Sequence, residues 1–147
     1  MTEQLHTEFS RFVESWGLQH FEPHEFLVHV GDVRKGHQCK FPPKGLWKNL
    51  KPTAMIVDEL RRRLGRPITI TSAYRSEGYN KAVGGVPLSQ HMQFKALDIK
   101  AKGLPPSKVY AELLKMRNEG KFKGGLGLYN GFVHVDTRGK NCSWRGK

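Results

Sequence analysis

Cysteine and long hydrophobic runs are both scarce in this chain. Cys39 and Cys142 are the only cysteines, and neither belongs to a Cys-x-x-Cys pair, which argues against a structural zinc knuckle. They could bridge an N-terminal loop to the C-terminal tail, but we favour two reduced thiols. No apolar run approaches the ~20 residues of a membrane span. The first residues lack the basic and apolar stretches of a secretory signal, so we expect synthesis in the cytoplasm without a signal peptide.

Acidic residues are also few. Asp and Glu number 13 against 25 Lys and Arg, which gives a formal net charge of +12. The charge favours a polyanionic partner, either an anionic bacterial envelope or nucleic acid, unless it only aids solubility. The basic residues are scattered from Lys44 to Lys147 without a compact arm of interleaved aromatics. We therefore favour the envelope over nucleic acid.

The spacing of apolar residues predicts a mixed α+β fold. Helices are expected over 5–16, 46–64, 76–83 and 105–118, and strands over 67–72, 95–100, 126–129 and 132–136. Pro52 should lie in the first turn of its helix or mark a later start. Residues 20–30 could form a helical turn or an edge strand, and 31–43 a long loop. Asn130-Gly131 predicts a hairpin between the last strands. A small antiparallel sheet flanked by helices follows from this order.

Alternation along two of these strands brings polar side chains to one face. Asp98 lies between Leu97 and Ile99, so it faces away from them. Val133 and Val135 share the apolar face of the final strand, which leaves His134 and Asp136 on the opposite face. If the two strands pair antiparallel, the three side chains converge, and His91 enters from the preceding loop. Two imidazoles and one carboxylate suit a catalytic zinc, which keeps a fourth position for water. The alternative is that each histidine is an ordinary surface or core residue.

A series of short motifs begins at Ser72. The motifs are Ser72-Ala73-Tyr74-Arg75-Ser76, Tyr79-Asn80, Gly84-Gly85, Ser89-Gln90-His91, Ala96-Leu97-Asp98-Ile99, Gly127-Leu128-Tyr129 and Phe132-Val133-His134-Val135-Asp136-Thr137-Arg138. Together they resemble the zinc D-Ala-D-Ala carboxypeptidases and the related phage L-Ala-D-Glu peptidases of the LAS superfamily, whose hedgehog members share the metal site. The resemblance spans roughly Pro43 to Gly139, and the N-terminal segment matches weakly.

The resemblance implies a role for each matched residue. His91, Asp98 and His134 would hold one zinc ion per chain. Arg75 would bind the carbonyl oxygen of the substrate, or else form a salt bridge at the strand end. The substrate-contacting residues would be Ser72, Tyr74, Ser89, Gln90 and Tyr129. Ser89 and Gln90 could instead orient His91, and Ser89 could simply shape the turn.

One position departs from the family pattern. Many relatives carry a catalytic Glu or Asp three residues before the last zinc histidine, where this chain has Gly131. A subgroup that ends in His-Val-His-Val-Asp has a histidine where this chain has Phe132. Asp136 is the only acid near His134 in sequence, so it is the candidate general base, or equally a partner that holds a ligand histidine. The next acids to consider are Glu22, Glu25 and Asp32.

The resemblance thus implies a zinc-dependent peptidase of peptidoglycan stem peptides. It would act as a D-Ala-D-Ala carboxypeptidase or an L-Ala-D-Glu endopeptidase, in the manner of a phage or prophage lysis enzyme working on the bacterial cell wall, in the periplasm or outside the cell. The alternative is a catalytically inactive, zinc-containing wall-binding module of the same fold. We expect a monomer with one peptidase domain over 1–147: a helix and loop (1–42), a zinc peptidase core (43–139) and a basic tail (140–147).

Overall fold

The centre of the molecule is a five-stranded sheet, with the strands in the order β3-β4-β6-β5-β7. The computed structural model describes residues 2–147. The strands are β3 (Ile68–Ser72), β4 (Ala96–Ala101), β5 (Gly125–Leu128), β6 (Val133–Asp136) and β7 (Cys142–Arg145). Neighbouring strands run antiparallel, except that β5 and β7 run parallel. The predicted α+β class is confirmed, with this one parallel pair as an addition.

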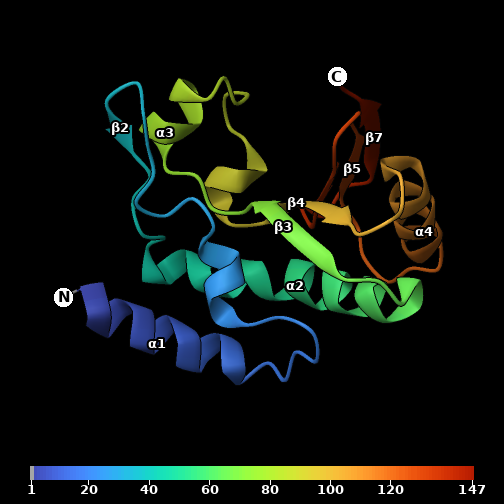
Figure 1. Ribbon diagram of the computed structural model, residues 1–147, viewed down its shortest axis with the longest axis horizontal. Coiled ribbons are helices and arrows are strands. Elements are labelled where there is room, and N and C mark those ends of the chain that lie inside the picture. The colour runs from blue at the N-terminus through green and yellow to red at the C-terminus, as the bar shows by residue number, and fades with distance from the viewer. Residues whose placement is uncertain (1) are drawn as a thin grey trace.

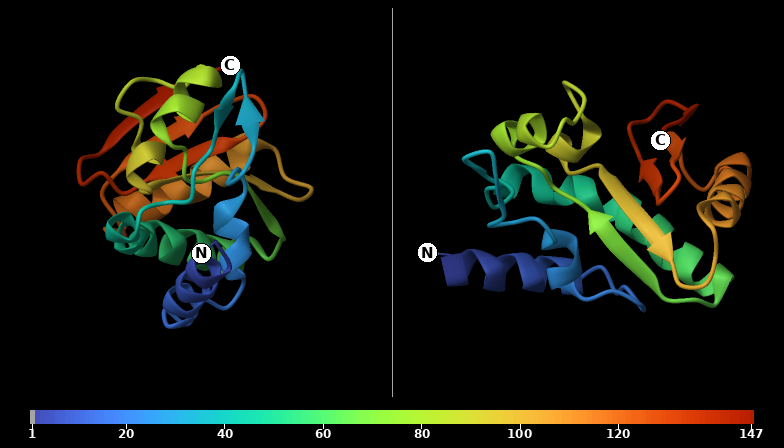
Figure 2. Two further views of the ribbon diagram at one scale, coloured as in Figure 1. Left: turned by 90° about the vertical axis from the view of Figure 1, so that its left-hand side faces the viewer. Right: turned by 45° about the horizontal axis from the view of Figure 1, so that its top comes forward.

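Helices flank the sheet and extend away from it (Figure 1). The α-helices are α1 (Thr2–Glu14), α2 (Lys44–Leu64), α3 (Glu77–Ala82) and α4 (Pro106–Asn118), and the 3-10 helices are η1 (Pro23–Leu27) and η2 (Gln90–Gln93). Helices α1 and α2 lie along one side of the molecule, while α4 packs beside β5 (Figure 1). A small hairpin of β1 (Val33–Arg34) and β2 (His37–Gln38) lies against α3 (Figure 2). Within residues 2–147, no helix is both long and apolar enough to cross a membrane.

The main elements lie within a few residues of the predicted ranges, and β5 and β6 form the expected antiparallel hairpin. Residues 20–30 contain a 3-10 helix, the first of the two alternatives. The prediction for Pro52 is wrong, because α2 begins at Lys44 and the proline lies inside the helix. Burial of one whole face of α2 holds the helix together despite the missing backbone hydrogen bond.

Two stretches have more structure than the sequence pattern predicts. The expected loop over 31–43 contains the β1–β2 hairpin, whose strands have only two residues each. The expected basic tail contains β7, whose residues alternate between half-buried and exposed. Strands this short carry too few residues for a periodic signal, and the partner of β7 lies 17 residues earlier in the chain.

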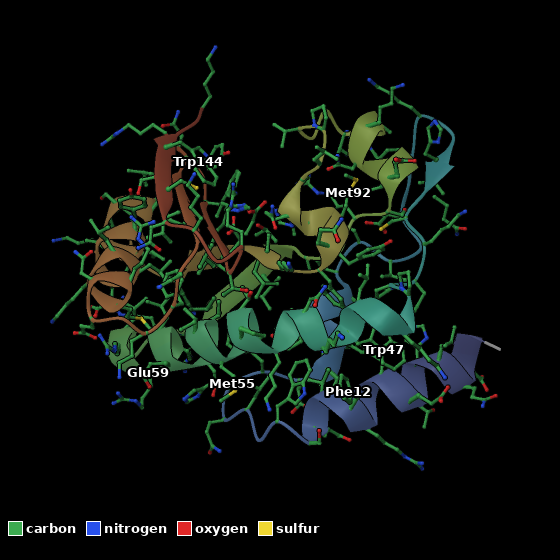
Figure 3. All side chains as sticks on the ribbon, turned by 180° about the vertical axis from the view of Figure 1, so that it is seen from behind. Phe12, Trp47, Met55, Glu59, Met92 and Trp144 are labelled. Atoms are coloured by element: carbon green, nitrogen blue, oxygen red, sulfur yellow. The ribbon has the colours of Figure 1, made fainter. Side chains whose placement is uncertain are left out.

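The N-terminal helix is part of the hydrophobic core. Phe9 of α1 is fully buried, and its ring lies 5.3 Å from Trp47 and 6.0 Å from Phe94, measured between centroids. Figure 3 shows the neighbouring Phe12 beside Trp47, where α1 packs on α2. Since Phe94 directly follows η2, which carries His91, α1 supports the segment that positions this histidine.

We predict that Phe9→Ala lowers the free energy of unfolding by about 3–5 kcal/mol, because it leaves a cavity between Trp47 and Phe94. Urea denaturation measures this loss. Phe12→Ala is the matched control from the same helix, since Phe12 is 39% exposed. The Phe12→Ala variant should lose clearly less free energy of unfolding than Phe9→Ala. Equal, small losses for both variants would show that α1 is not part of the folding unit.

Both cysteines are free thiols, as expected. Cys39 is buried, and its Sγ lies 3.5 Å from the carbonyl oxygen of Tyr74. Burial raises the pKa of the Cys39 thiol, so this side chain stays protonated and packs as a small apolar group.

Candidate metal centre

His91 is held in place by its own backbone and by the end of β3. Ser89 caps η2, and its Oγ accepts a hydrogen bond from the His91 backbone N–H at 3.1 Å. The Nδ1 atom of His91 lies 2.7 Å from the carbonyl oxygen of Ala73. A carbonyl only accepts, so Nδ1 carries the proton and Nε2 presents a lone pair. The ring orientation and the tautomer are therefore both set before any ligand arrives.

Asp98 and His134 lie directly opposite each other on neighbouring antiparallel strands, Asp98 on β4 and His134 on β6. Asp98 Oδ1 is 3.1 Å from Nε2 of His91 and 3.1 Å from Nδ1 of His134. The ligand atoms of the three residues lie within 4.8 Å of one another, and all three residues are buried. The structure thus brings together the three residues that were predicted from the sequence as metal ligands.

The electrostatics of this cluster favour a cation. Burial lowers the pKa of His91, so its ring is neutral and its Nε2 lone pair faces a carboxylate oxygen. Burial disfavours the charged form of Asp98, but the two histidines hold its pKa well below the usual range. Burial also disfavours a charged His134, but hydrogen bonds to Asp136 and Asp98 raise its pKa, so an added positive charge is stabilised there. A divalent ion would supply that positive charge and meet the His91 lone pair and the Asp98 carboxylate, so the donor set fits a metal.

Asp136 lies behind His134 and is fully buried. Its Oδ2 is 2.7 Å from Nε2 of His134, and its Oδ1 accepts a hydrogen bond from the Gly125 backbone N–H at 2.8 Å. Arg138 donates to both carboxylate oxygens, at distances of 2.7–3.2 Å. Burial acts to raise the pKa of Asp136, but the bonds from His134 and Arg138 hold it well below its usual value. This geometry suits a carboxylate that keeps the proton on His134 Nε2 and leaves Nδ1 free for a metal.

A cleft of about 600 Å³ opens over the three residues. Of the other predicted site residues, Arg75, Ser89, Gln90 and Tyr129 line this cleft. Arg75 is half-buried, and its Nε has no hydrogen-bond partner within residues 2–147. Burial lowers the pKa of Arg75, partly offset by Asp98. An arginine with an unpaired buried donor beside the cluster is suited to bind a substrate oxygen.

Other predicted residues lie outside the lining of the cleft. Tyr74 is buried in the core, with its ring 5.7 Å from that of Phe94, which places it under the site rather than in it. Ser72 is buried on β3 opposite Asp98. The N-terminal acids do not line the cleft: Glu22 and Glu25 form the capping box of η1, and Asp32 pairs with His29. Among the described residues that line the cleft, Asp98 is the sole acid.

Sequence reasoning missed the segment 83–88 as part of the cleft lining, and with it the side chains of Phe132, Arg138 and Trp144. Phe132 stacks on Tyr129 with the ring centroids 4.4 Å apart. The Trp144 ring lies 5.1 Å from that of His134. The only sequence signal for Trp144 is indirect: Gly125 and Gly127 alternate along β5, and such glycines mark a close approach of another group.

Comparison with known proteins agrees with this geometry. Residues 19–136 match the family model described as Peptidase M15. The chain belongs to the M15 peptidase family. A search of curated proteins gave no match. The family match confirms the resemblance found in the sequence, and together with the His-Asp-His cluster it makes this M15 chain a metallopeptidase, a hydrolase of peptide bonds.

Proposed function

We propose that this M15 peptidase is a zinc enzyme that cleaves peptidoglycan stem peptides, as a D-Ala-D-Ala carboxypeptidase or an L-Ala-D-Glu endopeptidase of the phage or prophage lysis type. The observation that carries the proposal is the buried His91, Asp98 and His134 cluster at the base of an open cleft. Two imidazoles and one carboxylate with a cleft above them are typical of a catalytic zinc rather than a structural one. The net charge of +12 favours work on an anionic bacterial wall, outside the cytoplasm.

The roles of the residues follow from their surroundings. Zinc, when bound, supplies Lewis acidity that polarises a carbonyl oxygen and lowers the pKa of water towards about 7. Arg75 donates a hydrogen bond to the oxygen on which negative charge develops, a contribution of about 3–4 kcal/mol for a single donor. Ala73 and Asp136 hold the two imidazole rings through hydrogen bonds of 2.7 Å.

The proposal is tested on purified peptidoglycan sacculi and soluble muropeptides, with products identified by chromatography and mass spectrometry. Zinc-loaded protein should shorten the stem peptides, and chelation should stop the reaction until zinc is restored. Release of D-Ala identifies a carboxypeptidase, whereas a new γ-D-Glu amino terminus identifies an endopeptidase. Intact substrates after prolonged digestion would refute the proposal.

A second candidate function is a zinc-containing wall-binding module without turnover. It is favoured by one observation, the burial of Asp136, which leaves Asp98 as the sole acid of the cleft among the described residues. In that case the zinc-loaded protein would sediment with sacculi but would leave every stem peptide intact.

We predict that Arg75→Gln lowers kcat by about 10²–10³-fold with zinc still bound, because it removes a donor to the developing negative charge. Arg66→Gln is the matched control, since Arg66 is exposed and lies outside the cleft. Steady-state kinetics at saturating zinc measure both variants. Unchanged kcat in Arg75→Gln would assign this arginine to the packing of the strand end instead.

A further inference from the structure

The C-terminal strand builds one wall of the cleft, beyond the span that the family model matches. Trp144 of β7 lies on β5, where a Cβ atom at Gly125 or Gly127 would come within 2.9 Å or 2.5 Å of the indole. The indole Nε1 donates to the Tyr129 hydroxyl at 2.9 Å. Figure 3 shows Trp144 on the opposite side of α2 from α1. The glycines thus let a flat aromatic surface form next to His134.

Arg138 contacts both this surface and Asp136, the carboxylate behind His134. Its Cζ is 5.4 Å from the centroid of the Trp144 ring, and its Nε and Nη2 donate to Asp136. One edge of the guanidinium is therefore fixed. The other edge carries Nη1, which has no hydrogen-bond partner within the described part of the chain. The side chain is 31% exposed and lines the cleft, so Nη1 is available to a ligand.

Arg138 is linked to the metal cluster through Asp136 and lines the same cleft as the three ligand residues. Arg138 contacts Asp136 at 2.7 Å, and Asp136 contacts the ligand histidine His134 at 2.7 Å. The same cleft is lined by a second arginine, Arg75. Among the described residues, the cleft contains a single acid, Asp98. A guanidinium with one fixed edge and one free edge binds carboxylates well, because little freedom is lost when the bond forms.

We propose that Nη1 of Arg138 binds a carboxylate of the substrate, with Trp144 and Tyr129 as the flat wall beside the peptide. The substrate class is then a peptide with a free carboxylate near the scissile bond. This inference rests on the proposed peptidase function. The carboxylate is either the C-terminal one or the α-carboxylate of a γ-linked D-Glu.

The test uses three synthetic peptides and the zinc-loaded full chain at saturating zinc. The first is L-Ala-γ-D-Glu-L-Lys-D-Ala-D-Ala; the second has the D-Glu α-carboxylate as a carboxamide, and the third has a C-terminal carboxamide. We expect one of the two amides to lose about 10–100-fold in kcat/KM, as for a lost charge-assisted hydrogen bond. The affected amide identifies which carboxylate is bound.

Arg138→Gln should remove this discrimination, so that the acid and the affected amide react within about threefold of each other. Arg145→Gln is the matched control, since Arg145 is an exposed arginine of β7, next to Trp144, and lies outside the cleft. The Arg145→Gln variant should prefer the acid over the affected amide to the same extent as the unmodified protein. If Arg138 only supports Asp136, Arg138→Gln slows all three peptides equally and keeps the ratio, which overturns the proposal.

The affinities of the same peptides, measured by calorimetry, separate this inference from the proposed function. If no peptide is cleaved, the proposed function fails, but an acid-over-amide preference in binding that disappears in Arg138→Gln still supports the carboxylate site. The carboxylate site is overturned if the acid and both amides bind with equal affinity, or if no peptide binds.

Discussion

Replacing His91 with alanine is expected to remove zinc from the protein and to lower peptidase activity by at least about 10³-fold. The ligand set consists of three side chains around one position, so the loss of one imidazole leaves too few donors for a stable site. The Lewis-acid contribution then disappears, and it is worth several kcal/mol of transition-state stabilisation. Elemental analysis after dialysis and assays on muropeptides measure the two effects together.

His134→Ala should behave as His91→Ala does, and His24→Ala is the matched control. His24 is an exposed histidine of η1, outside the cleft, so its loss should change neither zinc content nor rate. Circular dichroism checks that each variant folds. About one zinc per chain in the His91→Ala, His134→Ala double variant would show that the cluster is not the metal site.

The pairing of Asp98 with His134 could be predicted from the sequence for a simple physical reason. Each residue sits between apolar neighbours that must face the core, so the pleat of the strand turns both side chains to the other face. The short turn at 130–131 then fixes the register of β5 and β6, and β4 pairs with the other edge of β6 so that Asp98 lies opposite His134. Alternation along the strands therefore predicted the facing side chains of two of the three cluster residues, given that β4 pairs with β6.

The orientation of His91 could not be predicted in the same way. It depends on a 3-10 turn that ends at Phe94, whose backbone is left-handed with φ of 59°. A phenylalanine adopts this conformation here while its ring is fully buried against Phe9 and Tyr74. The residues that pack on Phe94 come from α1 and from the segment after β3. No periodic pattern of residues near His91 indicates this packing.

The burial of Asp136 could not be predicted either, because strand alternation does not show which groups cover a side chain. Alternation along β6 places Asp136 on the face of His134 but says nothing of what lies over it. The structure covers it with the backbone of Gly125 and the side chain of Arg138, next to β7. A four-residue parallel strand near the end of the chain is the kind of long-range pairing that single-sequence patterns miss.

We expect Asp136→Asn to weaken zinc binding by about 10–100-fold, the usual effect of losing a carboxylate behind a ligand histidine. An amide NH₂ in place of Oδ2 would point a donor at the N–H groups of His134 and Arg138. His134 would then favour the tautomer with its proton on Nδ1, the atom that faces Asp98. Zinc titration followed by stem-peptide assays measures affinity and rate in one series.

Excess zinc decides between the two roles of Asp136. For a carboxylate that only holds His134, activity returns to nearly the unmodified level once zinc saturates the variant, and this is the outcome we expect from its complete burial. A general base gives the opposite pattern: zinc stays bound while the rate falls by about 10²–10⁴-fold and does not recover. Asp32→Asn is the matched control, because Asp32 pairs with His29 outside the cleft, so neither zinc affinity nor rate should change.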